Sequence, residues 1–172
     1  ITAKTRLLIL NSPHNPTGMV MDEVDIAALS ALCAKYDIYL IGDEVYEHMV
    51  FDQAKHLSLC GYADLYARSF VISSFGKTYH VTGWKVGYCV APPALTKELR
   101  RLHQYVTFTV NTPVQLGIAD FLQQHPEHHQ QLPAFYQAKR DLFCELLQGS
   151  RFTVVPSQGT YFQLLGYDAI SA

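Results

Sequence analysis

Four short stretches of this chain combine residue types that could do chemistry together. They offer a lysine amine, a carboxylate, a phenol, an amide and hydroxyls, which suit proton transfer and nucleophilic attack. In chain order they are Asn15-Pro16-Thr17-Gly18, Asp43-Glu44-Val45-Tyr46, Ser74-Phe75-Gly76-Lys77 and Thr82-Gly83-Trp84-Lys85-Val86-Gly87. Taken singly each stretch is commonplace, as a turn, a helix cap, a solvated lysine or a packing tryptophan. Their combination in one chain indicates a site.

The first three stretches each follow a short apolar run that predicts a strand. The predicted strands are Arg6–Leu10, Ile38–Ile41 and Phe70–Ser73, with a further one at Val86–Val90. A helix between the first two strands makes a strand–helix–strand unit, which is typical of parallel pairing with a right-handed crossover. In such α/β folds the sites lie at the carboxyl ends of the strands. The spacing therefore places the polar stretches at one edge of a sheet.

The helix after the first strand has a recognisable beginning. Asp22 is an N-cap residue, and Asp25 three positions later predicts a weak capping box. Ile26, Leu29 and Leu32–Cys33 recur at helical spacing and are expected on one buried face.

The second half of the chain is predicted to be mainly helical. Helical patterns begin at Thr96 and near Pro113, and a long amphipathic segment covers about 133–147 before Gly149. Phe152–Val155 and Thr160–Leu165 are then predicted to be strands of a different, smaller layer. The fold class is α/β.

Composition excludes several classes of protein. The 172 residues carry a formal charge of −2, which gives no electrostatic footprint for nucleic acid or an anionic membrane. No apolar run approaches the ~20 residues of a membrane helix. The four cysteines form no CxxC pair, so we expect reduced thiols and a cytoplasmic protein. A buried strand so near a first residue that is not Met leads us to expect a fragment of a longer chain.

The four stretches, in this order and spacing, resemble the fold-type I aminotransferases of classes I and II. The resemblance is dense from Ile9 to Pro92 and looser beyond. It implies a three-layer, mostly parallel sheet flanked by helices, with Val86–Val90 as the antiparallel exception. It also implies that residues 1–132 are part of a large cofactor-binding domain. Residues 133–172 would be an interdomain helix and the start of a small α+β domain.

The same resemblance implies pyridoxal 5'-phosphate as the cofactor and assigns four residues to it. Lys77 matches the Schiff-base lysine, which also shuttles a proton once it is free. Asp43 matches the carboxylate beside the pyridine nitrogen, which deepens the electron sink that the cofactor provides. Asn15 and Tyr46 match the two donors to the phenolate oxygen of the ring.

Ser74 and Lys85 match the positions that hold the cofactor's phosphate. Most of the family has Arg where this chain has Lys85, and Lys lacks the bidentate fork of a guanidinium. The Gly-Trp-Lys sequence is found in aminotransferases of the kynurenine and glutamine type. The resemblance thus implies transamination between a 2-oxo acid and a methionine, glutamine or aromatic L-amino acid, with methionine our specific expectation. It also implies a homodimer.

Three alternatives were weighed. Gly76-Lys77-Thr78 looks like the end of a Walker A motif, but the required earlier glycine position is Val71, so a P-loop hydrolase is rejected. A cysteine-conjugate β-lyase or decarboxylase of the same fold stays open, because the cofactor residues would be the same. An aminotransferase-like domain of a transcription regulator also stays open.

Three histidines could be considered as metal ligands, but the sequence does not favour a metal site. His125, His128 and His129 are expected in a polar connection between helices, and no Cys or Asp completes a ligand set. His14 and His80 lie next to the motifs without an assignable role.

Overall fold

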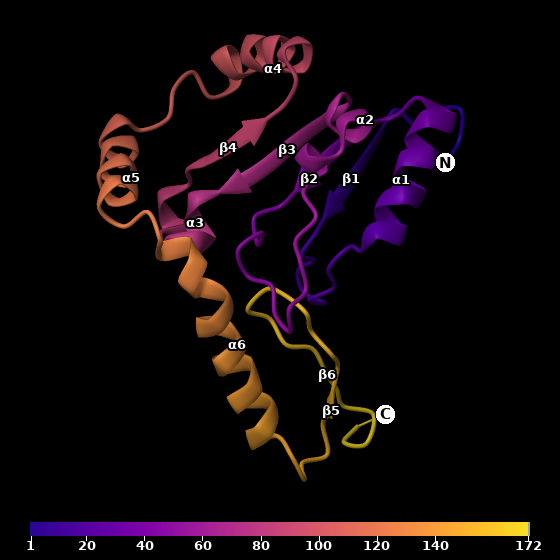
Figure 1. The fold of residues 1–172 in the computed structure, drawn as a ribbon, viewed down its shortest axis with the longest axis vertical. Coiled ribbons are helices and arrows are strands. Elements are labelled where there is room, and N and C mark those ends of the chain that lie inside the picture. The colour runs from indigo at the N-terminus through magenta and orange to yellow at the C-terminus, as the bar shows by residue number, and fades with distance from the viewer. Residues whose placement is uncertain (172) are drawn as a thin grey trace.

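The computed structural model describes residues 1–171 and contains two sheets and six α-helices in that range. The strands and α-helices, labelled in Figure 1, are β1 (Leu7–Asn11), α1 (Glu23–Tyr36), β2 (Tyr39–Asp43), α2 (Ala63–Tyr66), β3 (Ser69–Ser74), α3 (Phe75–Thr78), β4 (Gly87–Val90), α4 (Pro93–Val106), α5 (Thr112–Gln124), α6 (His128–Leu146), β5 (Thr153–Val154) and β6 (Leu165–Gly166). Two short 3₁₀ helices, η1 (Leu59–Gly61) and η2 (Thr82–Trp84), complete the order.

The main sheet has the strand order β1-β2-β3-β4. β1, β2 and β3 are parallel, and β4 is antiparallel to β3, as expected for the segment that ends at Val90. Register pairs Asn11 with Asp43 and Ser74 with Gly87. The last residues of three parallel strands and the first residue of β4 therefore meet at one edge of the sheet.

Helix α1 begins as its sequence predicts. The Asp22 carboxylate accepts hydrogen bonds from the backbone N–H groups of Val24 and Asp25, and the Asp25 side chain accepts one from the Asp22 N–H. Such a box satisfies amide donors that have no partner within the helix. The buried face was only partly right, because Cys33 is 1% exposed whereas Leu32 is 39% exposed.

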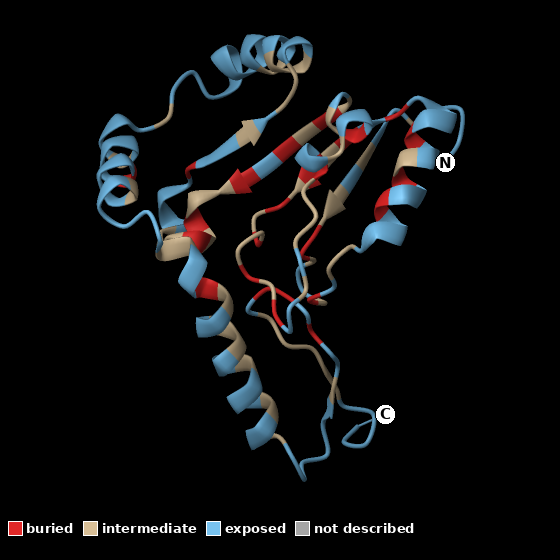
Figure 2. Cartoon of the chain, in the orientation of Figure 1, coloured by how far each residue is buried: buried red, intermediate tan, exposed pale blue. Residues whose placement is uncertain are grey.

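The hydrophobic core lies between α1 and the sheet. It contains apolar side chains from the helix, from β2 and β3 and from the segment between them: Ile26, Leu29, Cys33, Ile38, Leu40, Leu59, Leu65 and Val71. Figure 2 shows buried residues concentrated in this region and in the loops after the strands. Helices α4, α5 and α6 are largely exposed; within them only Ile118 and Leu132 are buried.

Several expected boundaries in the second half of the chain were wrong. The long helix begins at His128 instead of near residue 133, and Pro133 lies inside it. The stretch Thr160–Leu165 is mostly irregular, because only Leu165–Gly166 pairs with a strand, Thr153–Val154. None of the helices in residues 1–171 is long and apolar enough to cross a bilayer.

Candidate active site

The loops that follow β1, β2 and β3 leave the same edge of the sheet, so the predicted polar residues are brought together there (Figure 1). Asn11, the last residue of β1, joins two of these loops. Its side-chain amide donates to the Asp43 carbonyl (3.0 Å), and its side-chain oxygen accepts from the Asn15 backbone N–H (2.8 Å). This bridge fixes the start of the Asn15 loop against the end of β2.

The Asn15 loop is closed by a glycine that no other residue could replace without strain. Gly18 has φ +71°, and a Cβ built there would lie 2.0 Å from the Ser157 Oγ. The Gly18 carbonyl accepts from the Gln158 N–H at 2.9 Å. A left-handed, tightly packed position of this kind favours glycine. The loop is thereby held against the C-terminal part of the chain.

Asp43 and Tyr46 follow β2 at the centre of this edge. Asp43 is half-buried, and its carboxylate accepts from the Val45 N–H at 3.3 Å. Tyr46 is 2% exposed, and burial raises the pKa of its hydroxyl well above its usual value. Hydrogen bonding to Tyr161 raises that pKa further, whereas a hydrogen bond with Asn15 lowers it. Asn15 and Tyr46, predicted to share one task, are therefore neighbours in space.

Lys77 lies on the one-turn helix α3 that follows β3. Ser74 is its N-cap, and its hydroxyl oxygen accepts from the Gly76 N–H at 3.0 Å. The Lys77 Nζ is 6.0 Å from the centre of the Tyr46 ring. Lys77 is partly buried, and it has no ion pair among residues 1–171. A capped turn thus holds the Lys77 amine beside the Tyr46 ring.

The backbone next to Lys85 contacts Ser74, but Lys85 itself is exposed. The Val86 carbonyl accepts from the Phe75 N–H (3.2 Å) and from the Ser74 hydroxyl (3.3 Å). Lys85 has φ +56° at the end of η2, and its amine has no ion pair in the described part of the chain. The structure places Ser74 at the edge with Lys77, whereas Lys85 is an exposed residue.

The donor set at this edge fits pyridoxal phosphate. An amine, a carboxylate and an amide–phenol pair are the groups that an aldehyde, a ring nitrogen and a phenolate oxygen require. The hydroxyl of Ser74 and the N–H groups at the start of α3 suit a phosphate, although α3 is too short to count as a helix dipole.

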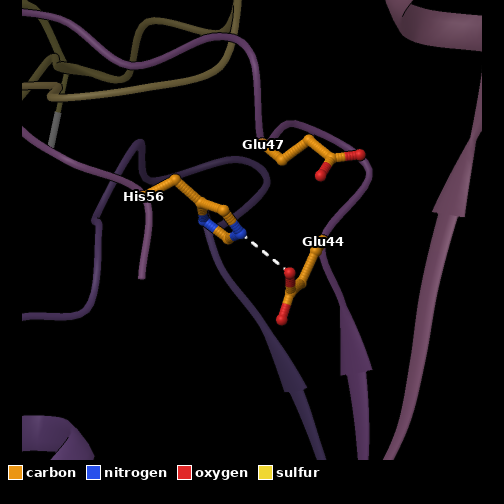
Figure 3. Close-up of side chains that lie close together, drawn as sticks. All are labelled: Glu44, Glu47 and His56. Atoms are coloured by element: carbon orange, nitrogen blue, oxygen red, sulfur yellow. Dashed lines mark hydrogen bonds and ion pairs between the residues drawn. The ribbon is translucent and has the colours of Figure 1, made fainter. Parts of the chain in front are cut away.

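Behind the Asp43 loop, two buried or partly buried glutamates brace the backbone (Figure 3). The Glu44 carboxylate accepts from the Leu59 N–H (2.9 Å) and pairs with His56 Nε2 (2.8 Å). Glu47 accepts from the hydroxyls of Ser73 (2.6 Å) and Tyr88 (2.8 Å). Glu44, Glu47 and His56 offer ligand atoms within 4.8 Å of one another. Both carboxylates already accept hydrogen bonds, those of Glu47 through Oε1 alone, and this arrangement holds the segment after β2 in place.

Two of the three histidines expected in a connection between helices lie in a helix, whereas His125 does lie between α5 and α6. His128 and His129 lie in the first turn of α6, not in a connection between helices, and His125 caps α5. The His128 Nε2 lies 3.0 Å from the Thr78 carbonyl, one residue after Lys77. Its ring also stacks on Tyr79, with centroids 5.5 Å apart. His128 therefore ties α6 to the turn that carries Lys77.

Sequence reasoning missed two residues at this edge. Asn11 could have been noticed as a polar residue at the end of an apolar run. Tyr161 had no local signal, because it lies far along the chain in a segment that was predicted as an ordinary strand. Its ring centre is 5.6 Å from the Lys77 Nζ.

Comparison with known proteins shows the family to which this sequence is similar. A family model described as aminotransferase class I and II matches residues 1–172. Methionine aminotransferase of Escherichia coli is 51% identical over 99% of this chain and 44% of its own length. Kynurenine–oxoglutarate transaminase of Dictyostelium discoideum is 40% identical over 94% of this chain and 38% of its own. The chain thus spans less than half the length of these relatives.

Solved structures give the same result. Escherichia coli YbdL, whose structure and reactivity identify a methionine aminotransferase function, has a TM-score of 0.95 and 50% identity, over 100% of this chain and 46% of its own. Thermus thermophilus aspartate aminotransferase with maleate has a TM-score of 0.88 and 27% identity, over 99% of this chain and 45% of its own.

Proposed function

The chain belongs to the class I and II aminotransferases, and we propose that it catalyses pyridoxal-phosphate-dependent transfer of an amino group between an L-amino acid and a 2-oxo acid. The family generally depends on this cofactor. The observation that carries the proposal is the position of Lys77, on a capped turn beside Tyr46 and at the same edge of the sheet as Asn15 and Asp43.

We assign the cofactor-binding roles to residues of this one edge. Asp43 would face the pyridine nitrogen, and Asn15 and Tyr46 would donate to the phenolate oxygen. Ser74 and Lys85 would hold the phosphate. When bound, the cofactor supplies an electron sink for the substrate's α-carbon. The raised pKa of Tyr46 supports its role, because the hydroxyl stays protonated and available as a donor.

Lys77 would do two jobs. It would hold the cofactor covalently, and when released its amine would carry a proton away from the substrate's α-carbon and return one later in the cycle. The second job requires a neutral amine.

We propose methionine as a preferred amino donor, because the relative with 51% identity is named a methionine aminotransferase. We further propose a cytoplasmic homodimer. The cysteines of the described residues are free thiols, which supports a reducing compartment. We keep the division into a large domain over 1–132 and an interdomain helix with the start of a small domain over 133–172. The course of α6 away from the sheet supports it (Figure 1).

Borohydride reduction of the full-length protein with bound cofactor, followed by peptide mapping, tests the assignment directly. We expect the pyridoxyl group on Lys77, and we expect Lys77→Ala to lose both this label and transamination. A label on Lys55, Lys85 or Lys97 would contradict the proposal. A screen of amino donors against several 2-oxo acids tests the substrate, and methionine should rank among the best donors.

A further inference from the structure

Two tyrosine rings from distant parts of the chain face the Lys77 amine. The Nζ lies 6.0 Å from the Tyr46 ring centre and 5.6 Å from that of Tyr161. The two rings are nearly perpendicular, at 85°, with centroids 5.4 Å apart. Tyr46 follows β2, whereas Tyr161 belongs to the segment between β5 and β6. The lysine side chain therefore lies in a corner with two aromatic walls.

The backbone just before Tyr161 is held to the sheet edge by hydrogen bonds. The Thr160 N–H donates to the Met49 carbonyl at 2.9 Å, and the Gln158 N–H donates to the Gly18 carbonyl at 2.9 Å. Gln158 also accepts from the Phe51 N–H at 2.8 Å. These bonds join the segment before Tyr161 to both the Asn15 loop and the chain that follows Tyr46.

Thr160 supports the same conclusion because its conformation is costly. This β-branched residue is fully buried and has φ +67°, a left-handed conformation that such side chains rarely adopt. Backbone strain of this kind persists only where the surroundings over-determine it, and it gathers at functional sites. The strained residue directly precedes Tyr161, and its conformation sets the direction in which the ring is presented.

The distances decide how the Tyr161 ring acts. Attraction between an ammonium ion and an aromatic face weakens beyond about 6 Å, and both rings lie near that limit. The rings therefore act mainly as walls. They restrict the flexible four-carbon side chain of Lys77 and hold its amine in one position. Tyr161 also packs on Tyr136 of α6, with centroids 5.8 Å apart, so the wall is itself supported.

We propose that Tyr161 is a positioning residue for Lys77, which confines the amine through its ring. This inference rests on the proposed function. It assigns to the C-terminal segment a part in the reaction that the four motifs do not contain. The proposal requires the ring to hold the amine. The Tyr161 hydroxyl is not required, because burial is the larger cause of the raised Tyr46 pKa.

The test compares Tyr161→Leu, which removes the ring, with Tyr161→Phe, which keeps it, in the full-length protein. Tyr167→Leu is the matched control, because Tyr167 is 61% exposed and lies outside the site. Two readouts are used. One is the rate at which added cofactor becomes covalently attached to the apoprotein, followed by visible absorbance. The other is the separate effect on kcat and KM for the amino donor.

We expect Tyr161→Leu to slow covalent attachment and to lower kcat by about tenfold or more, with KM within about threefold, since a misplaced reacting group costs mainly rate. Tyr161→Phe and Tyr167→Leu should stay within about threefold of wild type in both readouts. If Tyr161→Leu matches wild type, or if Tyr161→Phe falls as far as Tyr161→Leu, the ring-confinement proposal is refuted. A wild-type protein that borohydride does not label at Lys77 would refute the proposed function as well; normal labelling with an unaffected Tyr161→Leu refutes this inference alone.

Discussion

Replacing Lys85 with Ala should weaken cofactor binding by roughly tenfold, less than loss of a buried phosphate partner would predict. Losing one member of a buried ion pair costs about 3–5 kcal/mol, whereas exposed pairs contribute about 1 kcal/mol or less. The Lys85 side chain is exposed and has no competing ion pair in residues 1–171. A charge-assisted hydrogen bond that water still reaches is worth about 1.5 kcal/mol, or tenfold in Kd.

The measurement is the cofactor Kd of the full-length protein, by equilibrium dialysis and back-titration. Lys85→Arg should bind within about threefold of wild type, because a guanidinium can bind two phosphate oxygens at once. Both substitutions keep a Cβ at the φ of +56°, so they share the same backbone strain. Lys97→Ala, on the exposed surface of α4, is the control. An unchanged Kd for Lys85→Ala would remove Lys85 from the site, and a hundredfold loss would refute the argument from exposure.

Two further predictions concern acidic residues. Asp43→Asn keeps an oxygen for the Val45 N–H but loses the negative charge. The first half-reaction should therefore slow by about three powers of ten (~4 kcal/mol), with little change in the cofactor Kd. Single-turnover absorbance measures this rate, and a rate within tenfold of wild type would contradict the prediction. The Arg140 guanidinium holds the pKa of the Asp52 carboxyl below its usual value. This pair therefore stabilises the folded state above about pH 4. The stabilisation is lost as pH falls through the lowered pKa of the folded state. Asp52→Asn should therefore flatten the acid side of the stability curve in urea unfolding, by a small amount because Asp52 is exposed; an unchanged slope would show that the pair contributes nothing.

The parts of the fold that could be predicted depend on local signals. The capping box of Asp22 and Asp25 lies within one turn, so the beginning of α1 was correct. The position of Lys77 at the end of β3 followed from an apolar run and a turn. The face of α1 was less well predicted, because Leu32 and Cys33 are adjacent in sequence and only one of two neighbours can point into the core.

The parts that failed depend on tertiary contacts. Pro133 suggested a helix start, but α6 begins at His128. The imidazole ring of His128 stacks on Tyr79 and lies within hydrogen-bond distance of the Thr78 carbonyl. Proline is tolerated inside a helix where packing offsets the lost hydrogen bond. Tyr161 could not have been found, since its place at the site depends on hydrogen bonds to residues more than a hundred positions earlier.

The link between His128 and the Thr78 carbonyl has a mechanical consequence. Helix α6 has 19 residues, a rod of about 28 Å that is pinned to the Lys77 turn at its first residue. Pro133 lacks the N–H that would bond to the carbonyl four residues earlier, so the turn before it is where the rod can bend. A bend of 5° there would displace the far end by about 2 Å while the pinned end stays still. Beyond α6 the chain is bonded to the sheet edge again through Gln158 and Thr160, so these bonds oppose such a bend, and the helix is held near Lys77 at its start and through the segment that follows its end.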